Sequence, residues 1–537
     1  MPALFARFSL SLSRWSKYLA SFIPEVSLDY PFSRNDIGML QRCTAKPGDA
    51  CIDDQSWNDL LLDQYSDHIS AQVSIFGQQV LHQRLRMGLT NEASQALAAR
   101  LRELQQAPAL AAELQSICRP LRESDTEISA LLFGAQALHD VPAWARYLWM
   151  LPLLLPASLL LAIWTPWAWI GAGTAIFFLL SLQSSFFMRV QVWNKAIKSI
   201  QLMLGVATRL GNHAEKNETA FTASFIAYRA RAGKVNRALS DHPELNLIPA
   251  GRAYYDWFAL GNVRHYFKTR DLVLLHQDLL QRCFIGCAEL EADLALARHL
   301  NATESICWSE RSVDKQIVLE KFIHPLMSDP APLSIALDGK GAFISGQNGI
   351  GKSTMLRALG LNLITARSFG FCYAHSAQLP ALPVYTCMQS EDSLLGGESL
   401  YIAELRRARE MLASSLSPQR GVYIIDEIFR GTNHLESISA AAAVLHALSE
   451  NCSVIVSSHN LVLAALLKQS LLPFCVSTGV NKNQKLMLNP GVLPDTNGIA
   501  LLAMHGFDQR ISAQAEKVAL WLSEYLSHPG ECEQILI

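Results

Sequence analysis

Residues 344–354 carry the chemically richest pattern in the chain: they read Ile-Ser-Gly-Gln-Asn-Gly-Ile-Gly-Lys-Ser-Thr and contain the complete motif G-x-x-x-x-G-K-[ST]. In such a loop, glycines let backbone N–H groups face phosphate oxygens, the lysine adds a cation, and the following hydroxyl ligates Mg²⁺. The apolar residues 342–344 predict a strand before the loop, and residues 355–359 predict a helix after it. A glycine-rich turn with a surface lysine is the alternative, which the complete motif in this context disfavours.

The loop is therefore predicted to bind ATP or GTP. Lys352 is expected to bridge the β- and γ-phosphates, and the Ser353 hydroxyl to ligate Mg²⁺. The helix N-terminus adds its positive dipole end to the same oxygens. The residues expected to hold the nucleotide are Gly346, Asn348, Gly349, Gly351, Lys352, Ser353 and Thr354.

Two carboxylates end a second apolar segment, residues 422–425, which is typical of a buried strand. Asp426 fits a ligand of Mg²⁺, and Glu427 fits the group that polarises an attacking water. After another apolar segment, residues 453–456, His459 is placed to contact the γ-phosphate and sense its loss. Solvated acids and structural histidines at strand ends are common, but the phosphate loop shifts the balance towards Mg²⁺-dependent hydrolysis of ATP.

These motifs together resemble the ATPase domain of the DNA mismatch repair MutS family. Residues 346–354, 426–432 (Asp-Glu-Ile-Phe-Arg-Gly-Thr) and 457–459 (Ser-Ser-His) are similar to three family motifs, and residues 392–401 resemble the family's signature loop. The resemblance implies a homodimer in which that loop completes the partner's nucleotide site. Ser399, at a helix N-terminus, is then expected to contact a γ-phosphate in trans. Gln347 stands where the family has proline.

The resemblance extends upstream and covers about residues 45–135 and 190–526. Residues 322–326 are similar to the family's element before the ATPase domain, and residues 53–60 with 77–81 resemble the opening of its core domain. The chain begins about where that core begins. A mismatch-reading domain is accordingly expected to be absent.

A long uncharged run separates two parts of the predicted helical core. Between Arg146 and Arg189 the sequence contains no Asp, Glu, Lys or Arg. Because roughly twenty apolar residues cross a bilayer core as a helix, the run predicts a transmembrane hairpin with spans near 147–164 and 168–188. A buried helical hairpin is the alternative. Cations at both ends of the run favour placing both ends in the cytoplasm, where ATP is available.

Periodic apolar spacing over residues 69–139 and 191–300 predicts helices on both sides of this run. The fold expected is an α-helical core or lever domain with an inserted transmembrane hairpin, followed by a P-loop α/β ATPase domain of the ABC/MutS type. The expected divisions are 1–44 (N-terminal segment), 45–140 (helical core, first part), 147–188 (hairpin), 189–304 (helical lever, second part), 305–526 (ATPase domain) and 527–537 (tail).

Composition adds constraints on partners. The net charge of −2 gives no global attraction to nucleic acid or anionic lipid, and the eleven cysteines occur without C-x-x-C pairs, which favours reduced thiols. The first 24 residues lack the long apolar region of an export signal. Cations mix with aromatics in residues 228–237, 252–255 and 264–268. Such clusters contact nucleic acid, form a solvated helix face, or face acidic lipid headgroups.

The function expected from these observations is a membrane-anchored ATPase of the MutS family, whose ATP cycle moves the helical levers. Two alternatives stay open. In the first, the protein acts on DNA, as the family does. In the second, it is a nucleotide-switched membrane scaffold with no DNA partner. Half of an ABC-type transporter is a weaker third alternative, because two spans are too few for a translocation path.

Overall fold

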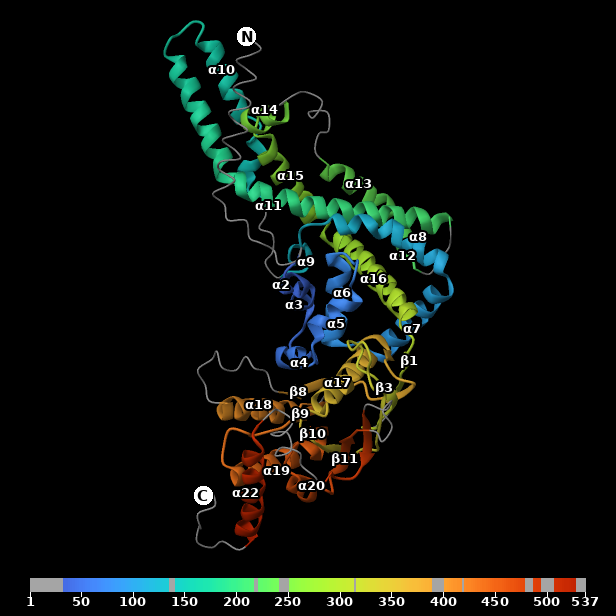
Figure 1. Cartoon of the computed structure of the whole chain (residues 1–537). Coiled ribbons are helices and arrows are strands. Elements are labelled where there is room, and N and C mark those ends of the chain that lie inside the picture. Colours follow the sequence, from blue (N-terminus) through green and yellow to red (C-terminus); the bar gives the residue numbers. More distant parts are fainter. Residues whose placement is uncertain are drawn as a thin grey trace. The chain divides into compact units, whose positions relative to one another are not determined.

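The computed structural model describes residues 32–134, 141–216, 221–240, 251–312, 315–388, 400–417, 420–478, 486–493 and 507–527 (Figure 1). The chain forms two compact units that are not consecutive in sequence. The helical unit comprises residues 1–47, 70–83 and 100–298, and the sheet unit comprises 48–69, 84–99 and 299–537. The sheet unit thus includes two segments from the region that the sequence analysis assigns to the helical core.

The described part of the helical unit consists of helices. Several start at recognisable signals: a capping box joins Ser33 and Asp36 at the first, and Pro108 opens another at a position where its missing N–H costs nothing. The helices are α2 (Arg34–Ile37), α3 (Met39–Thr44), α6 (Ile75–Met87), α7 (Asn91–Gln106), α8 (Pro108–Cys118), α9 (Ser129–Phe133), α10 (Leu154–Leu161), α11 (Ala168–Lys216), α12 (Ala223–Ile226), α13 (Arg229–Leu239), α14 (Gly251–Phe258), α15 (Gly261–Leu275) and α16 (Gln277–Ala302).

Short 3₁₀ turns connect some of these helices: η1 (Arg119–Glu123), η2 (Ala143–Tyr147) and η3 (Leu151–Leu153). Three of the five boundaries between the units fall within helices, namely α6, α7 and α16. Figure 1 shows α10 beside the first part of α11, while the rest of α11 runs along α8 and α13. We call residues 144–192 the apolar arm.

Within the apolar arm, only one of the described helices is long and apolar enough to cross a membrane, namely α11. The expected first span, 147–164, contains the shorter apolar helix Leu151–Leu161. Pro152 and Pro156 explain why this helix is shorter than the expected span. Proline is tolerated only in the first turn of a helix, and α10 therefore begins at Leu154. The expected second span begins at residue 168 as predicted but continues without a break to Lys216. The two-span hairpin is thus not confirmed.

The sheet unit contains all the strands in the described residues. They are β1 (Cys307–Trp308), β2 (Glu310–Arg311), β3 (Ile317–Phe322), β4 (Leu333–Leu337), β5 (Gly341–Gly346), β6 (Phe371–Cys372), β7 (Ser376–Leu379), β8 (Val384–Cys387), β9 (Val422–Asp426), β10 (Ser453–Ser457), β11 (Leu471–Ser477) and β12 (Met487–Pro490). Its helices are α4 (Asp54–Asp59), α5 (Leu62–Ile69), α17 (Lys352–Phe369), α18 (Leu400–Ser415), α19 (His434–Asn451), α20 (Val462–Leu466) and α22 (Gln509–Ser527).

The main sheet of the described residues has the order β12-β11-β5-β10-β9-β8, and all its pairs except β11–β12 are parallel. Smaller sheets follow the orders β2-β7-β3-β4 and β1-β6. In β5, β9 and β10 nearly every residue is buried, as expected for a parallel sheet covered on both faces. The strands predicted at 342–344, 422–425 and 453–456 lie in these three elements.

Candidate functional site

Strand order brings the sequence motifs to one edge of the main sheet. Strand β10 lies between β5 and β9, and Ser457 at its end is in register with Ile344 on one side and Asp426 on the other. The phosphate loop follows β5, and the two carboxylates end β9. Because the carboxyl ends of parallel strands meet at the same edge, three segments far apart in sequence converge there.

The phosphate loop turns directly into α17. Gly349 and Gly351 have φ angles of 72° and 106°, which residues with a Cβ rarely adopt, and Gly351 is the N-cap of α17. Ser353 and Thr354 lie in the first turn of this helix, where free backbone N–H groups and the helix dipole favour phosphate. The loop therefore has the backbone form that its sequence predicts.

Lys352 lies inside the loop rather than on the surface. Its side chain is buried, and Nζ donates to the carbonyl oxygens of Gly346 at 2.9 Å and Gln347 at 3.1 Å. Burial lowers the pKa of this ammonium group, while Glu427 and Asp426 act in the opposite direction. A cation held among backbone carbonyls and carboxylates fits an anionic phosphate ligand.

Asp426 and Ser457 are joined at the ends of neighbouring strands. Asp426 is buried, and its Oδ1 accepts a hydrogen bond from the Ser457 hydroxyl. The Glu427 backbone N–H donates to the Ser457 carbonyl oxygen at 3.0 Å. The chain turns sharply after β9, since Glu427 has a φ of 57° and Phe429 a φ of 61°. Such left-handed conformations cost free energy in non-glycine residues and are enriched at functional sites.

Glu427 holds the centre of a charged cluster. Its Oε1 lies 2.7 Å from His459 Nε2, and its other oxygen pairs with the Arg430 guanidinium. His459 Nε2 is also 3.4 Å from Lys352 Nζ. Burial lowers the pKa of His459, and Lys352 and Arg430 lower it further against the opposing effect of Glu427. The structure thus brings together Lys352, Glu427 and His459, which the sequence assigns to one site.

Two residues of this site were not assigned a role from the sequence. Arg430 pairs with Glu427 and also donates to the Asp426 carbonyl oxygen at 3.1 Å. Glu404 on α18 accepts a hydrogen bond from the Arg430 backbone N–H at 2.9 Å, and burial raises the pKa of the Glu404 carboxyl. Arg430 lies within the quoted motif 426–432, so its position was a usable signal. Glu404 has no such signal.

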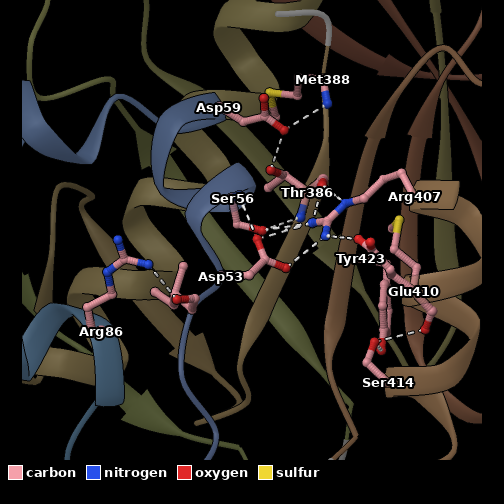
Figure 2. A network of polar contacts seen from close by, with 12 residues as sticks. Asp53, Ser56, Asp59, Arg86, Thr386, Met388, Arg407, Glu410, Ser414 and Tyr423 are labelled. Atoms are coloured by element: carbon pink, nitrogen blue, oxygen red, sulfur yellow. Dashed lines mark hydrogen bonds and ion pairs between the residues drawn. The ribbon is translucent and has the colours of Figure 1, made fainter. Parts of the chain in front are cut away.

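The next turn of α18 anchors a buried polar network (Figure 2). Arg407 Nη1 lies 2.9 Å from Asp53 Oδ2, and Nη2 donates to the Thr386 carbonyl oxygen at 2.6 Å. Asp59 accepts from the Thr386 hydroxyl at 2.7 Å and from the Met388 N–H at 2.9 Å. Burial raises the pKa of Asp59, whereas Asp53 has a lowered pKa because its bonds to Arg407 and Ser56 outweigh burial. The network fixes α4 to β8 and α18.

Part of the predicted site lies outside the described residues. This applies to Ser399 and to the rest of residues 392–399 within the signature loop. The trans role of Ser399 therefore stays a prediction, as do the chemical roles of the other site residues. Among the residues that the structure describes, no group of three or more His, Cys, Asp or Glu side chains forms a metal site.

Comparison with known proteins identifies the region around this site. Residues 342–523 match the family model described as MutS domain V. The endonuclease MutS2 of Thermus thermophilus is 36% identical over 171 residues, which is 31% of this chain and 22% of that protein. The DNA mismatch repair protein MutS of T. thermophilus is 27% identical over 198 residues (36% of this chain, 24% of that protein), and that of Salinibacter ruber is 26% identical over 268 residues (46% and 28%).

The three relatives match over about a quarter of their own length, and the family model covers the region where the phosphate loop, the carboxylates and His459 converge. The family resemblance of the motifs and the family model agree on the same region. Residues 342–523 of this chain are therefore a MutS-family domain V.

Proposed function

We propose that this chain binds and hydrolyses ATP at the site built from the phosphate loop, β9 and β10. The observation that carries the proposal is the convergence of the Lys352 ammonium group, the Glu427 carboxylate and the His459 imidazole at one sheet edge. The match of residues 342–523 to MutS domain V supports it, because that region contains all three residues. The buried cation and the free N–H groups of α17 hold phosphates, and Gly349 leaves open space beside the loop.

The donor set also fits Mg²⁺, a hard cation that prefers oxygen ligands. The Ser353 hydroxyl and the Asp426 carboxylate would hold it, with Ser457 orienting Asp426. When bound, Mg²⁺ neutralises charge on the phosphates. The carboxylate of Glu427 accepts hydrogen bonds and orients the attacking water, and His459 stays neutral near pH 7 because its pKa is lowered.

The proposed turnover is tested with Glu427→Ala. This variant should retain ATP with Mg²⁺, because Lys352 and the loop are intact, but should hydrolyse it about 100-fold more slowly or worse. Lys352→Ala should instead lose nucleotide binding. Exposed Glu450 and Lys340 offer matched controls, and Glu450→Ala and Lys340→Ala should behave as the parent. ATP hydrolysis by Glu427→Ala at the parental rate would refute the assignment of the carboxylate.

Dimerisation belongs to the same proposal. If residues 392–399 complete the partner's site, ATP binding and dimerisation strengthen each other. Glu427→Ala with ATP should then sediment as a dimer in analytical ultracentrifugation, and the nucleotide-free chain should sediment as a smaller species. Equal sedimentation with and without ATP would remove the composite site from the proposal.

Membrane anchoring through the apolar arm is the second part of the proposed function. Only 22% of the most apolar window of α11 is buried, which is unlike the core helix of a soluble protein. Large apolar side chains of the arm are exposed, including Trp164 at 78%, Trp167 at 80% and Phe177 at 75%. Exposed apolar surface on this scale requires a cover. In this proposal a lipid bilayer covers the exposed surface of the arm, and both ends of the arm lie in the cytoplasm.

Coupling of the ATP site to the helical segments is supported by a chain of contacts inside the sheet unit. Glu427 pairs with Arg430, whose backbone binds Glu404 of α18. One turn later, Arg407 of α18 holds Asp53 beside α4. Helix α4 leads through α5 towards α6, which enters the helical unit. A change at the γ-phosphate that releases Glu427 from its contacts would thus be transmitted to α4 through α18.

DNA action is proposed from the relatives alone, since they are named for mismatch repair and as an endonuclease. The alternative function is a nucleotide-switched membrane scaffold without DNA, and the exposed apolar arm agrees with both alternatives. Arg229, one of the cations in the cluster at residues 228–237, is less suited to contact a nucleic-acid phosphate, because it already pairs with Glu215. Binding of the detergent-solubilised chain to labelled DNA, followed as salt is raised, separates the two alternatives.

A further inference from the structure

A cavity of about 390 Å³ lies in the helical unit, at the foot of the apolar arm. Arg146 and Trp149 line it from the segment that leads into α10, and Arg264 and Lys268 line it from α15. The residues that line the cavity are far in sequence from Lys352, Glu427 and His459, and the proposed binding of ATP does not use them.

Aromatic packing fixes one of the residues that line the cavity. Phe267 is buried, and its ring centroid lies 5.3 Å from that of Trp144 and 5.5 Å from that of Phe186. Trp193 of α11 donates to the Thr269 hydroxyl of α15 at 2.8 Å. These contacts dock α15 against α11 where the uncharged run ends, so the cavity keeps its position relative to the apolar arm.

The rim of the cavity is cationic. Arg264 and Lys268 are one helical turn apart on the exposed face of α15, and Arg146 is exposed in η2. In the described part of the chain, none of these three cations has an ion-pair partner. Asp271 is the acidic residue among those that line the cavity, and Ser240 adds a hydroxyl. The lining therefore offers three cations for an anion and the oxygens of Ser240, Tyr255 and Asp271 for a hydrogen-bonding group beside it.

We propose that this cavity binds the headgroup of an anionic phospholipid, with Arg146, Arg264 and Lys268 on the phosphate and Asp271 accepting from a headgroup hydroxyl. The inference rests on the proposed membrane anchoring. Arg146 directly precedes the uncharged run, and Trp149 is exposed beside it, as aromatic side chains are at the bilayer interface. Basic pockets between helices at this depth recognise lipid headgroups.

Nucleic acid fits this site less well. Its backbone requires a groove or stripe of cations along several phosphates, whereas the three cations here converge on one small cavity that aromatic side chains also line. A soluble phosphate ester shares the phosphate chemistry but has no acyl chains to lie along the exposed apolar arm. The proposal therefore commits to the lipid, and the experiment includes both other ligands.

The test uses the full chain in a neutral detergent, titrated with dihexanoyl phosphatidylglycerol in a calorimeter. Parallel titrations use dihexanoyl phosphatidylcholine, glycerol phosphate and a single-stranded oligonucleotide. Arg264→Gln with Lys268→Gln should weaken phosphatidylglycerol binding about 25-fold, since each surface cation contributes roughly fivefold. Arg231→Gln with Lys234→Gln removes the same charge from the exposed face of α13, outside the cavity, and should leave the affinity within about twofold of the parent.

Phosphatidylcholine and glycerol phosphate should each bind the parent at least about tenfold more weakly than phosphatidylglycerol. Equal affinity of the parent and the Arg264→Gln, Lys268→Gln variant for phosphatidylglycerol would overturn the proposal. Glycerol phosphate binding as tightly as the lipid, or loss of oligonucleotide binding in that variant with lipid binding unchanged, would do the same. Extraction of parent membranes with alkaline carbonate tests anchoring separately: a retained chain without selective lipid binding refutes only the cavity, and a released chain refutes the anchor.

Discussion

Two regions of this chain have similar apolar sequences and opposite surroundings. Strand β9 reads Val-Tyr-Ile-Ile-Asp, and all its residues are buried between neighbouring strands and helices. The first part of α11 is as apolar, yet most of its large side chains are exposed. The comparison teaches that an apolar sequence predicts that a segment is shielded from water, but does not predict whether protein or lipid shields it. In β9 the cover is the protein itself, and in the arm we propose lipid.

Substituting arginine for one phenylalanine of the main sheet and for one of the arm should give the largest effect. Phe343 in β5 is 0% exposed, so Phe343→Arg buries an unpaired charge and should prevent folding of the sheet unit. Phe177 in the arm is 75% exposed, so Phe177→Arg should leave the chain folded in detergent. In a bilayer the same change costs about 3 kcal/mol and should increase release by alkaline carbonate. Identical carbonate behaviour of Phe177→Arg and the parent would break the comparison.

Removing Arg407 tests whether buried polar groups in the sheet unit depend on their partners. Arg407→Leu leaves Asp53 and the Thr386 carbonyl without their cation and should lower the free energy of unfolding by about 3 kcal/mol. The value is at the low end for such pairs because Asp53 keeps a third of its side chain exposed. The exposed pair Asp278–Arg282 is the control, and Arg282→Leu should change stability by less than about 0.5 kcal/mol. Urea denaturation measures the free energy of unfolding of both variants. Equal losses in Arg407→Leu and Arg282→Leu would contradict the stabilising role assigned to the Arg407 network.

A smaller effect is expected from acid. Burial lowers the pKa of His324 to about 4, helped by Arg357, and its Nδ1 accepts the Leu326 N–H at 3.2 Å. Because the folded-state pKa lies below the ordinary value, the stabilisation is present above about pH 6.5 and is lost as pH falls towards 4. The loss should reach about 2–3 kcal/mol. His324→Asn keeps an acceptor without titrating and should flatten this pH profile, whereas exposed His375→Asn should not; an unchanged profile in His324→Asn would exclude His324 as the cause.

Local patterns predicted the strands that bring Lys352, Glu427 and His459 together, because each of these strands lies beside a short motif, while the chemical roles of the three residues stay predictions. Strands β5, β9 and β10 and the start of α17 follow the apolar segments beside those motifs. Pairs between distant residues had no such signal: Arg430 binds Glu404 across 26 positions, and Arg407 binds Asp53 across 354. The arm was predicted less accurately, since residue counting gave two spans while Pro152 and Pro156 delay the start of α10.

The network around α4 also sets an order of assembly during synthesis. Asp59 and Thr386 are 327 residues apart, and at about 5–20 residues per second the ribosome needs roughly 15–65 s to make the chain between them. Strand β5 likewise has both neighbours, β10 and β11, still to be made when it emerges. Until then α4 lacks its contacts with β8, and β5 lacks both neighbouring strands. The apolar arm is translated within this interval, so it leaves the ribosome before the proposed nucleotide site exists.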